Sequence, residues 1–142
     1  MRRLISRAQF DAVMGRAPWA RSPHFALHML VLADAQAPAL RAFGGDPLWI
    51  GCVLPKRHAK RAVTRNTMRR LIYEGVGRHA AGLTPAAWVA RLNRGLDLAE
   101  YPSACSQALR RDLRAEIDGL LAGAARRLKT QAAARSAPLA AP

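Results

Sequence analysis

The sequence has 142 residues, 51% of them hydrophobic, which suits one domain with a modest core. Its 23 Lys and Arg residues outnumber nine Asp and Glu residues, and the net charge of +14 favours nucleic acid, or less readily an anionic membrane surface, as partner. No apolar run approaches the roughly 20 residues of a membrane-spanning helix, and the basic start leads into no apolar stretch typical of a secretory signal. We therefore expect a cytoplasmic protein without a membrane partner.

A short helix is predicted near the start of the chain, over residues 6–14. Ser6 can cap its N-terminus, and Phe10, Val13 and Met14 fall on one face at helical spacing. Phe10 has two possible roles: it is either a core residue or a partly exposed ring on which a nucleotide stacks.

Three strands are predicted from apolar runs. Residues 25–32 and 48–54 are nearly continuous apolar stretches, and residues 87–92 form a third. The second run is apolar on both faces, which predicts a central position in the sheet. Residues 33–47 contain Gly-Gly and Asp-Pro and predict a loop, and residues 81–85 predict a turn.

The densest positive charge lies in residues 56–70, called the basic segment below. Seven of its fifteen residues are Lys or Arg, and none is acidic. Like charges at this density cost stability through self-repulsion, whereas a polyanion would favour them by releasing its condensed counterions. The alternative, a solvated charged face, is disfavoured by the lack of counter-charges. The basic residues are Lys56, Arg57, Lys60, Arg61, Arg65, Arg69 and Arg70.

The basic segment continues into a helix predicted over residues 60–78. An apolar stripe on this helix should face the sheet, and it consists of Thr64, Met68, Leu71, Ile72 and Gly75. Beside the stripe lies a second set of residues, called the basic arc, made of Arg65, Asn66, Arg69 and Arg70. The amide of Asn66 both donates and accepts, so it can hold a hydrated metal on phosphate, a base edge or neighbouring main chain.

A long last helix is predicted from a cap at Ser103 to about Lys129. Residues 93–102 before it predict a loop, and residues 130–142 after it predict a disordered tail rich in Ala and Pro. The domain itself is therefore expected to span residues 1–129. The apolar stripe of the helix is Cys105, Leu109, Leu113, Ile117, Leu120, Leu121, Ala124 and Leu128.

The sequence offers no self-contained catalytic site and no metal site. His24 and His28 would lie about 13 Å apart on one face of a strand, too far to share a metal. His58 lies in the basic segment, where it contacts phosphate or stays solvated. Cys52 and Cys105 lie among apolar residues and are expected to be buried, reduced thiols. The acidic residues of the last helix are expected to face solvent: Asp112, Glu116 and Asp118.

The sequence around the basic arc resembles that of a known family, the bacterial ribonuclease P protein subunit. The signature helix of that family is matched by residues 62–72, which read Ala-Val-Thr-Arg-Asn-Thr-Met-Arg-Arg-Leu-Ile. Residues 51–57 are similar to the family's central strand, which ends in two basic residues, and residues 7–14 are similar to its first helix. Residues 88–91 match its last strand, and the order of elements agrees to about residue 129.

Three positions depart from the family pattern. Thr67 stands where a third Arg is common after Arg-Asn, which would remove one phosphate contact. Met14 stands where an aromatic residue is frequent, which would remove a second stacking surface. Pro55 replaces the usual Ser before the basic pair.

The resemblance implies a small single α+β domain, in which a four-stranded sheet packs with three helices as in domain 2 of ribosomal protein S5. It also implies a left-handed β-α-β crossover through the basic helix, against the usual hand. Since only three strands are predicted from the sequence, the fourth would lie near residues 39–43.

The function implied by the resemblance is that of the protein subunit of ribonuclease P, an endoribonuclease whose RNA subunit carries the chemistry. One protein would bind one catalytic RNA, and the complex would remove the 5′ leader of precursor tRNA with Mg²⁺ held mainly by the RNA and the substrate. A leader-binding cleft would be lined by Phe10, Val13, Met14 and Lys56. The RNA-binding surface would consist of Lys56, Arg57, Lys60, Arg61, Arg65, Asn66, Arg69 and Arg70.

Two other functions are compatible with parts of the sequence. A structural RNA-binding protein of the ribosomal type would use the same basic helix without a role in catalysis. A stand-alone metal-dependent nuclease would need clustered carboxylates or histidines, which the sequence does not show.

Overall fold

A mixed five-stranded sheet forms the middle of the fold in the computed structural model, which describes residues 1–32, 43–96 and 106–136. The spatial order of the strands is β1-β4-β5-β3-β2. β4 is parallel to both β1 and β5, whereas β3 is antiparallel to β5 and to β2. The bounds are β1 Arg2–Arg3, β2 Ala20–Arg21, β3 Phe25–Val31, β4 Leu48–Val53 and β5 Ala86–Leu92.

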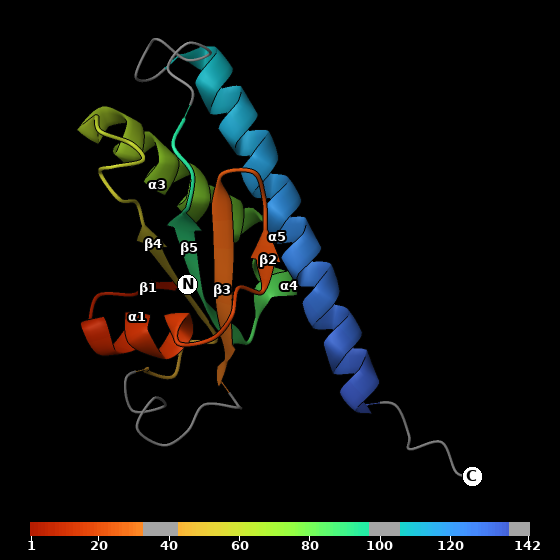
Figure 1. The fold of residues 1–142 in the computed structure, drawn as a ribbon. Coiled ribbons are helices and arrows are strands. Elements are labelled where there is room, and N and C mark those ends of the chain that lie inside the picture. Colours follow the sequence, from red (N-terminus) through yellow and green to blue (C-terminus); the bar gives the residue numbers. More distant parts are fainter. Residues whose placement is uncertain (33–42, 97–105, 137–142) are drawn as a thin grey trace.

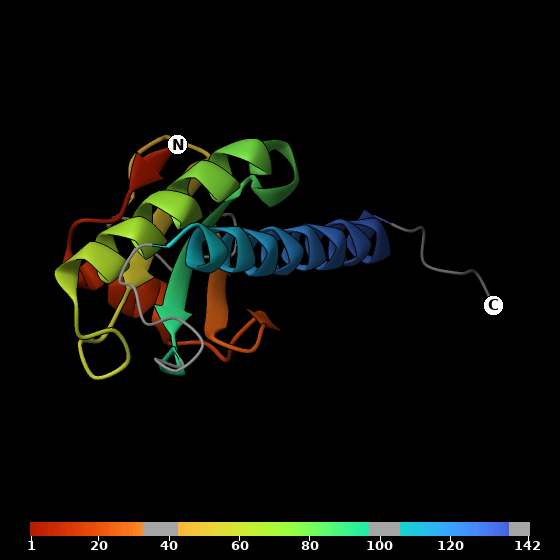
Figure 2. The same ribbon diagram turned by 90° about the horizontal axis from the view of Figure 1, so that it is seen from above.

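Helices cover both faces of this sheet (Figure 1, Figure 2). α1 lies on one face, and α3, α4 and α5 lie on the other. The central strand β5 supplies both cores by alternation of its side chains: Trp88 packs in the cluster of α3 and α5, and Val89 packs in the cluster of α1. The helix bounds are α1 Arg7–Met14, α3 Ala62–Arg78, α4 Ala80–Leu83 and α5 Gln107–Ser136.

The connection between β4 and β5 has an uncommon hand. The two strands are parallel neighbours, and α3 and α4 join them. Seen from the side of α1 with both strands pointing up, β5 lies to the right of β4 and α3 lies behind the sheet (Figure 1). This arrangement is a left-handed crossover, opposite to the usual one, and it confirms the expectation drawn from the resemblance.

The predicted α+β fold and its long elements are confirmed, and their bounds differ by one or two residues except for those of the last helix. α1 begins with a capping box, because the Ser6 hydroxyl accepts from the Gln9 N–H (3.2 Å) while Gln9 Oε1 accepts from the Ser6 N–H (3.1 Å). This reciprocal pair satisfies two backbone donors that a helix start otherwise leaves open. No helix among the described residues is both long enough and apolar enough to cross a membrane.

The sheet corrects several expectations. It has five strands rather than four, since the two-residue strands β1 and β2 were not predicted. β4 is an interior strand, paired with β1 and β5, although β5 rather than β4 takes the middle position. A short helix, α4, replaces most of the turn predicted over residues 81–85. The strand expected near residues 39–43 falls almost entirely outside the described residues.

The last helix begins and ends later than predicted. It starts at Gln107, where the Ser106 hydroxyl accepts from the Leu109 N–H at 3.0 Å, and Ser103 and Cys105 lie outside the described residues. It continues to Ser136, so residues 130–136, expected to be part of a disordered tail, are helical. The residues after Leu128, the last buried apolar residue of α5, are mostly Ala, Lys, Gln and Arg, which have high helix propensity and extend the helix to Ser136.

Glu116 ties α5 to the β2–β3 hairpin instead of facing solvent. Its carboxylate accepts from the Ser22 hydroxyl and from the His24 N–H at 2.8 Å, and it lies 2.6 Å from His24 Nδ1. The Glu116 side chain is only 12% exposed. Nearby, Trp19 Nε1 donates to the Ala124 carbonyl at 3.2 Å. These contacts attach the edge of the sheet to the helix that covers it.

We expect Glu116→Ala to lower the free energy of unfolding by about 2–3 kcal/mol, because it leaves the partly buried His24 N–H and the Ser22 hydroxyl without their charged acceptor. Chemical denaturation monitored by circular dichroism measures the change. Glu74→Ala is the matched control, since Glu74 is exposed and has no ion pair or hydrogen bond among the described residues, and it should change stability by less than about 0.5 kcal/mol. Equal effects of the two substitutions would contradict the structural role of Glu116.

Candidate nucleic-acid interface

One side of α3 packs in the core with α5 and the sheet, and the charged residues lie on its other side. The predicted stripe is confirmed, and the buried residues of α3 are Thr64, Thr67, Met68, Leu71, Ile72, Gly75 and Val76. Gly75 allows α5 to come close, because a Cβ added there would lie 3.0 Å from Leu121 and 3.1 Å from Ile117. The basic arc lies outside this contact and is exposed or half-buried.

Each member of the basic arc has its own surroundings. The Arg65 guanidinium donates to the main-chain carbonyls of Ala59 (2.8 Å) and Lys60 (2.9 Å), so it holds the loop before α3 against the helix. The Asn66 Oδ1 accepts from Arg69 at 3.0 Å, an interaction within the arc. Arg70 is exposed and has no ion pair or side-chain hydrogen bond within the described part of the chain. Arg65 is thus a structural residue as well as a charged one.

The loop between β4 and α3 presents the remaining charge of the basic segment. Lys56, Arg57 and Lys60 are exposed and form no ion pair among the described residues. His58 is half-buried, and its main-chain N–H donates to the Pro55 carbonyl at 3.0 Å in a turn. The first turn of α3 contains no acidic residue, so the positive end of the helix dipole adds to the side-chain charges.

Arg3 joins the basic arc from the far end of the sequence and was not predicted. β1 pairs with β4, and this places the Arg3 guanidinium 4.2 Å from the centre of the Tyr73 ring on α3, a cation–π contact. A surface hollow of about 370 Å³ lies here. It is lined by Arg3, Asn66, Arg69, Arg70, Tyr73 and Glu74. The only available signal was the Arg pair at positions 2 and 3.

Below this hollow, Cys52 is a free thiol that stays protonated. Burial raises the pKa of the Cys52 thiol to about 12, although the nearby charges of Arg69 and Arg3 and a hydrogen bond with Tyr73 act in the opposite direction. A thiol with this pKa is almost entirely uncharged at neutral pH and is a poor nucleophile. Cys52 was expected to be a buried, reduced thiol; it is free but only half-buried, and Cys105 lies outside the described residues.

Thr67, which stands where the family often has a third Arg, faces the packed side of α3. It is 4% exposed, and its hydroxyl donates to the Val63 carbonyl at 2.9 Å. Beside it lies a second hollow of about 410 Å³, lined by Val63, Asn66, Thr67 and Arg70. A longer basic side chain at position 67 would have to leave the packed face. Thr67 therefore contributes to packing, and the phosphate contact of an additional Arg is absent here.

The residues predicted to line a leader-binding cleft differ in exposure. Phe10 is half-buried, and its ring covers Gly51 of β4, where an added Cβ would lie 2.6 Å from the ring. Val13 is fully buried, so it supports α1 from below and offers no surface for direct contact, contrary to the prediction. Met14 is half-buried and Lys56 is exposed. Phe10 is therefore packed against the sheet without being fully buried, so the stacking role considered for it stays a prediction.

The two predicted surfaces lie on opposite faces of the sheet. α1 with Phe10 covers one face, and α3 with the basic arc covers the other (Figure 1, Figure 2). β4 connects them, because Gly51 touches Phe10 whereas Cys52, the next residue, lies against α3. Lys56 follows the end of this strand.

The histidines have separate structural partners. His24 contacts Glu116, whereas His28 Nδ1 lies 3.0 Å from the Arg16 carbonyl. His79 Nε2 lies 3.3 Å from an Asp118 carboxylate oxygen, which also accepts from Arg78 at 2.8 Å. Partial burial acts to raise the pKa of Asp118, but the hydrogen bonds and charges of these two residues hold it below its usual value. Among the described residues, no group of three or more His, Cys, Asp or Glu side chains could hold a metal ion.

Comparison with known proteins gives consistent results. The family model described as Ribonuclease P matches residues 1–115. The chain is 33% identical over 124 residues to the ribonuclease P protein component of Paraburkholderia xenovorans, covering 87% of this chain and 81% of that protein. It is 34% identical over 116 residues to that of Bordetella parapertussis, covering 82% and 85%. The solved structure of Staphylococcus aureus RNase P protein has a similar fold, with a TM-score of 0.61 at 15% identity, covering 86% of this chain and 94% of that one.

The contact between Phe10 and Gly51 generates a stability prediction. Gly51→Ala should lower the free energy of unfolding by about 1–3 kcal/mol, the range for overpacking, because the new methyl group would collide with the ring. Urea unfolding of Gly51→Ala in the wild-type and in a Phe10→Ala background forms a double-mutant cycle. The cost should fall in the second background, with a remainder from Leu4, which lies 3.0 Å from the same position. The same cost in both backgrounds would show that the ring does not rest on Gly51.

Proposed function

The chain belongs to the ribonuclease P protein family, and we propose that it is the subunit that binds the catalytic RNA of ribonuclease P and the 5′ leader of precursor tRNA. Family membership implies a role in tRNA 5′ processing as part of an endoribonuclease complex. The observation that carries the proposal is the exposed positive charge of the basic arc and of the loop before α3. Among the described residues, no ion pair with a carboxylate neutralises Lys56, Arg57, Lys60, Arg65, Arg69 or Arg70.

The RNA-binding surface is proposed to consist of the basic arc, the loop residues Lys56, Arg57, Lys60 and Arg61, and Arg3. Arg69 and Arg70 would contact phosphate directly, since guanidinium groups match phosphate geometry with two parallel hydrogen bonds. Arg65 would contribute partly by positioning Lys60 for RNA, because its guanidinium donates to the Lys60 main-chain carbonyl. Asn66 accepts from Arg69 at its Oδ1, so its amide N–H groups stay available to donate to RNA oxygens.

The leader-binding surface is proposed to lie on the other face of the sheet, beside α1. Phe10 offers the uncovered part of its ring to a base, and stacking of this kind tolerates any base because each has a π-face. Met14 would add a polarizable apolar contact, and Lys56 would contact the leader backbone. Val13 would only support α1, since it is fully buried.

The hydrolysis itself is proposed to belong to the RNA subunit, with Mg²⁺ held mainly by that RNA and by the substrate. The described surface around Asn66 is basic and repels a bare divalent cation, so Asn66 would meet such an ion only through its water shell on phosphate. The contribution of the protein is to raise affinity for the RNA and the precursor, one protein to one RNA. Neutralising phosphate charge in this way lowers the Mg²⁺ concentration that the complex needs.

Reconstitution tests the proposed function. Adding the protein to ribonuclease P RNA at low Mg²⁺ should restore cleavage of precursor tRNA, because the basic surface replaces cations that the RNA otherwise requires. Arg69→Ala should weaken binding to the RNA by about 1–3 kcal/mol if it loses a charge-assisted bond to phosphate. Filter binding measures this effect, and Arg126→Ala, at an exposed position in the second half of α5, is the control.

Two results would contradict the proposal. RNA binding without any stimulation of cleavage would indicate a structural RNA-binding protein of the ribosomal type. Cleavage by the purified protein in the absence of RNA would indicate a stand-alone nuclease.

Phe10 substitutions test the leader-binding surface. Phe10→Leu keeps an apolar side chain over Gly51 but removes the aromatic face, so it should reduce affinity for precursor tRNA by about 1–3 kcal/mol, the range for one stacked base. Affinity for mature tRNA, which has no leader, should stay the same. Thermal melting of the variant is the control for packing. Equal losses for both tRNAs together with a lowered melting temperature would assign Phe10 to the core alone.

A further inference from the structure

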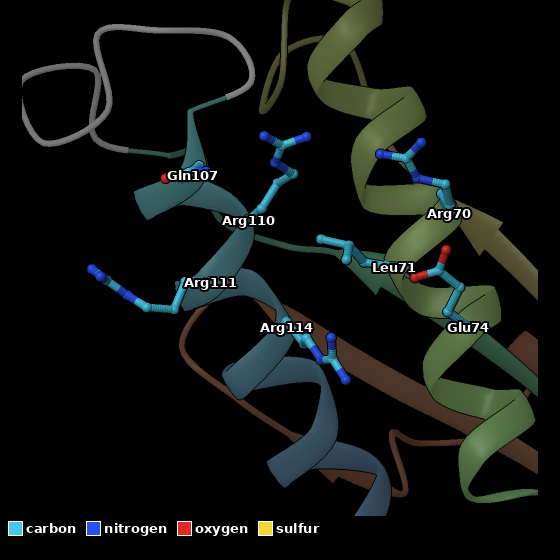
Figure 3. Close-up of a pocket in the computed structure, with 7 residues that line it drawn as sticks. All are labelled: Arg70, Leu71, Glu74, Gln107, Arg110, Arg111 and Arg114. Carbon is cyan, nitrogen blue, oxygen red and sulfur yellow. The ribbon is translucent and has the colours of Figure 1, made fainter.

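A groove between α3 and α5 lies beyond the predicted RNA-binding surface. Its volume is about 490 Å³, and it extends from the middle of α3 to the first turns of α5 (Figure 3). Arg70 and Glu74 line it from α3, Arg110 and Arg114 line it from α5, and Leu71 lies between the two helices. No residue of α5 was predicted to bind RNA.

Arg70 and Arg110 point toward one another from opposite walls of the groove (Figure 3). Within the described part of the chain, neither guanidinium has an ion pair or a hydrogen bond. The neighbouring arginines of α5 differ in this respect. Arg114 lies 3.8 Å from Asp118, and Arg111, which also lines the groove, lies 3.4 Å from Asp112. The unneutralised charge is therefore concentrated at the Arg70–Arg110 pair.

Two facing guanidinium groups repel each other unless an anion lies between them. Here they face each other across the largely buried side chain of Leu71, which is 7% exposed and offers no polar group of its own. A phosphodiester has two unesterified oxygens, so it can accept from one guanidinium on each side. Glu74 also lines the groove and disfavours an anion, but it is one carboxylate against four arginines.

We propose that Arg70 and Arg110 together hold one phosphodiester group of the ribonuclease P RNA, which extends the RNA-binding surface from α3 onto α5. The inference rests on the proposed function and adds a contact to it. The catalytic RNA is the expected source of the phosphate because Arg70 also belongs to the basic arc, so one RNA backbone can run along the arc and into the groove. The precursor leader is proposed to bind on the opposite face of the sheet.

Affinity for the catalytic RNA at several salt concentrations tests the proposal. Arg110→Gln should weaken binding roughly 5- to 50-fold and should reduce the slope of log affinity against log salt by about 0.7–0.9, the value for one phosphate contact. Arg126→Gln removes the same charge about four turns further along α5, outside the groove, so its affinity should stay within about twofold of wild type because no contact is lost. Thermal melting checks that both variants fold equally well. Equal effects of the two substitutions would overturn the proposal.

A double variant separates one shared phosphate from two independent contacts. If both arginines hold the same phosphate, the double variant Arg70→Gln/Arg110→Gln should lose little more affinity than the single variant with the larger loss. The slope of log affinity against log salt should then fall by the amount expected for about one contact. Additive losses and a slope change of about two contacts would overturn the shared site. A loss confined to precursor tRNA, with unchanged affinity for the catalytic RNA, would overturn the assignment of the phosphate to that RNA. Failure of the wild-type protein to bind the RNA at all would overturn the proposed function itself.

Discussion

The contact between α3 and the layer beneath it decides where the positive charge of this protein lies. Met68, Ile72 and Val76 are almost completely buried on one side of the helix, and burial of each such side chain stabilises by about 1.5–3 kcal/mol. Like charges at i, i+4 on the other side cost only a few tenths of a kcal/mol per pair. Packing therefore outweighs the repulsion, and the helix holds Arg65 and Arg69 at a spacing that an isolated peptide would disfavour.

The long elements were predictable because their sequences repeat at the period of the structure. The predicted stripes of α3 and, from Leu109 on, of α5 are buried in the structure, and the predicted cap Ser6 marks the start of α1. The two-residue strands β1 and β2 are too short to show alternation, so only tertiary pairing identifies them. The position of β5 at the centre of the sheet depends in turn on the left-handed crossover, which the sequence pattern alone does not indicate.

The candidate interface was predictable only where charge is dense along the chain. The basic segment is visible as a run of Lys and Arg residues, whereas Arg3 and Arg110 reach the same region from distant positions through β1 and α5. The fold also assigns roles that composition cannot distinguish. Arg65 bonds main-chain carbonyls while Arg70, five residues later, has no such partner among the described residues, and Glu116 holds a hairpin although it is spaced like a surface residue.

The placement of α1 and α3 on opposite faces of one sheet has a consequence for sequence change. Stacked layers are about 10 Å apart, and substitutions separated by that distance without shared partners act nearly independently on free energy. Selection can therefore alter the residues around Phe10 without disturbing the arginines of α3, and the reverse also holds. Gly51 and Cys52 are the exception, since these adjacent residues of β4 touch both layers, so a change in this strand acts on both surfaces at once.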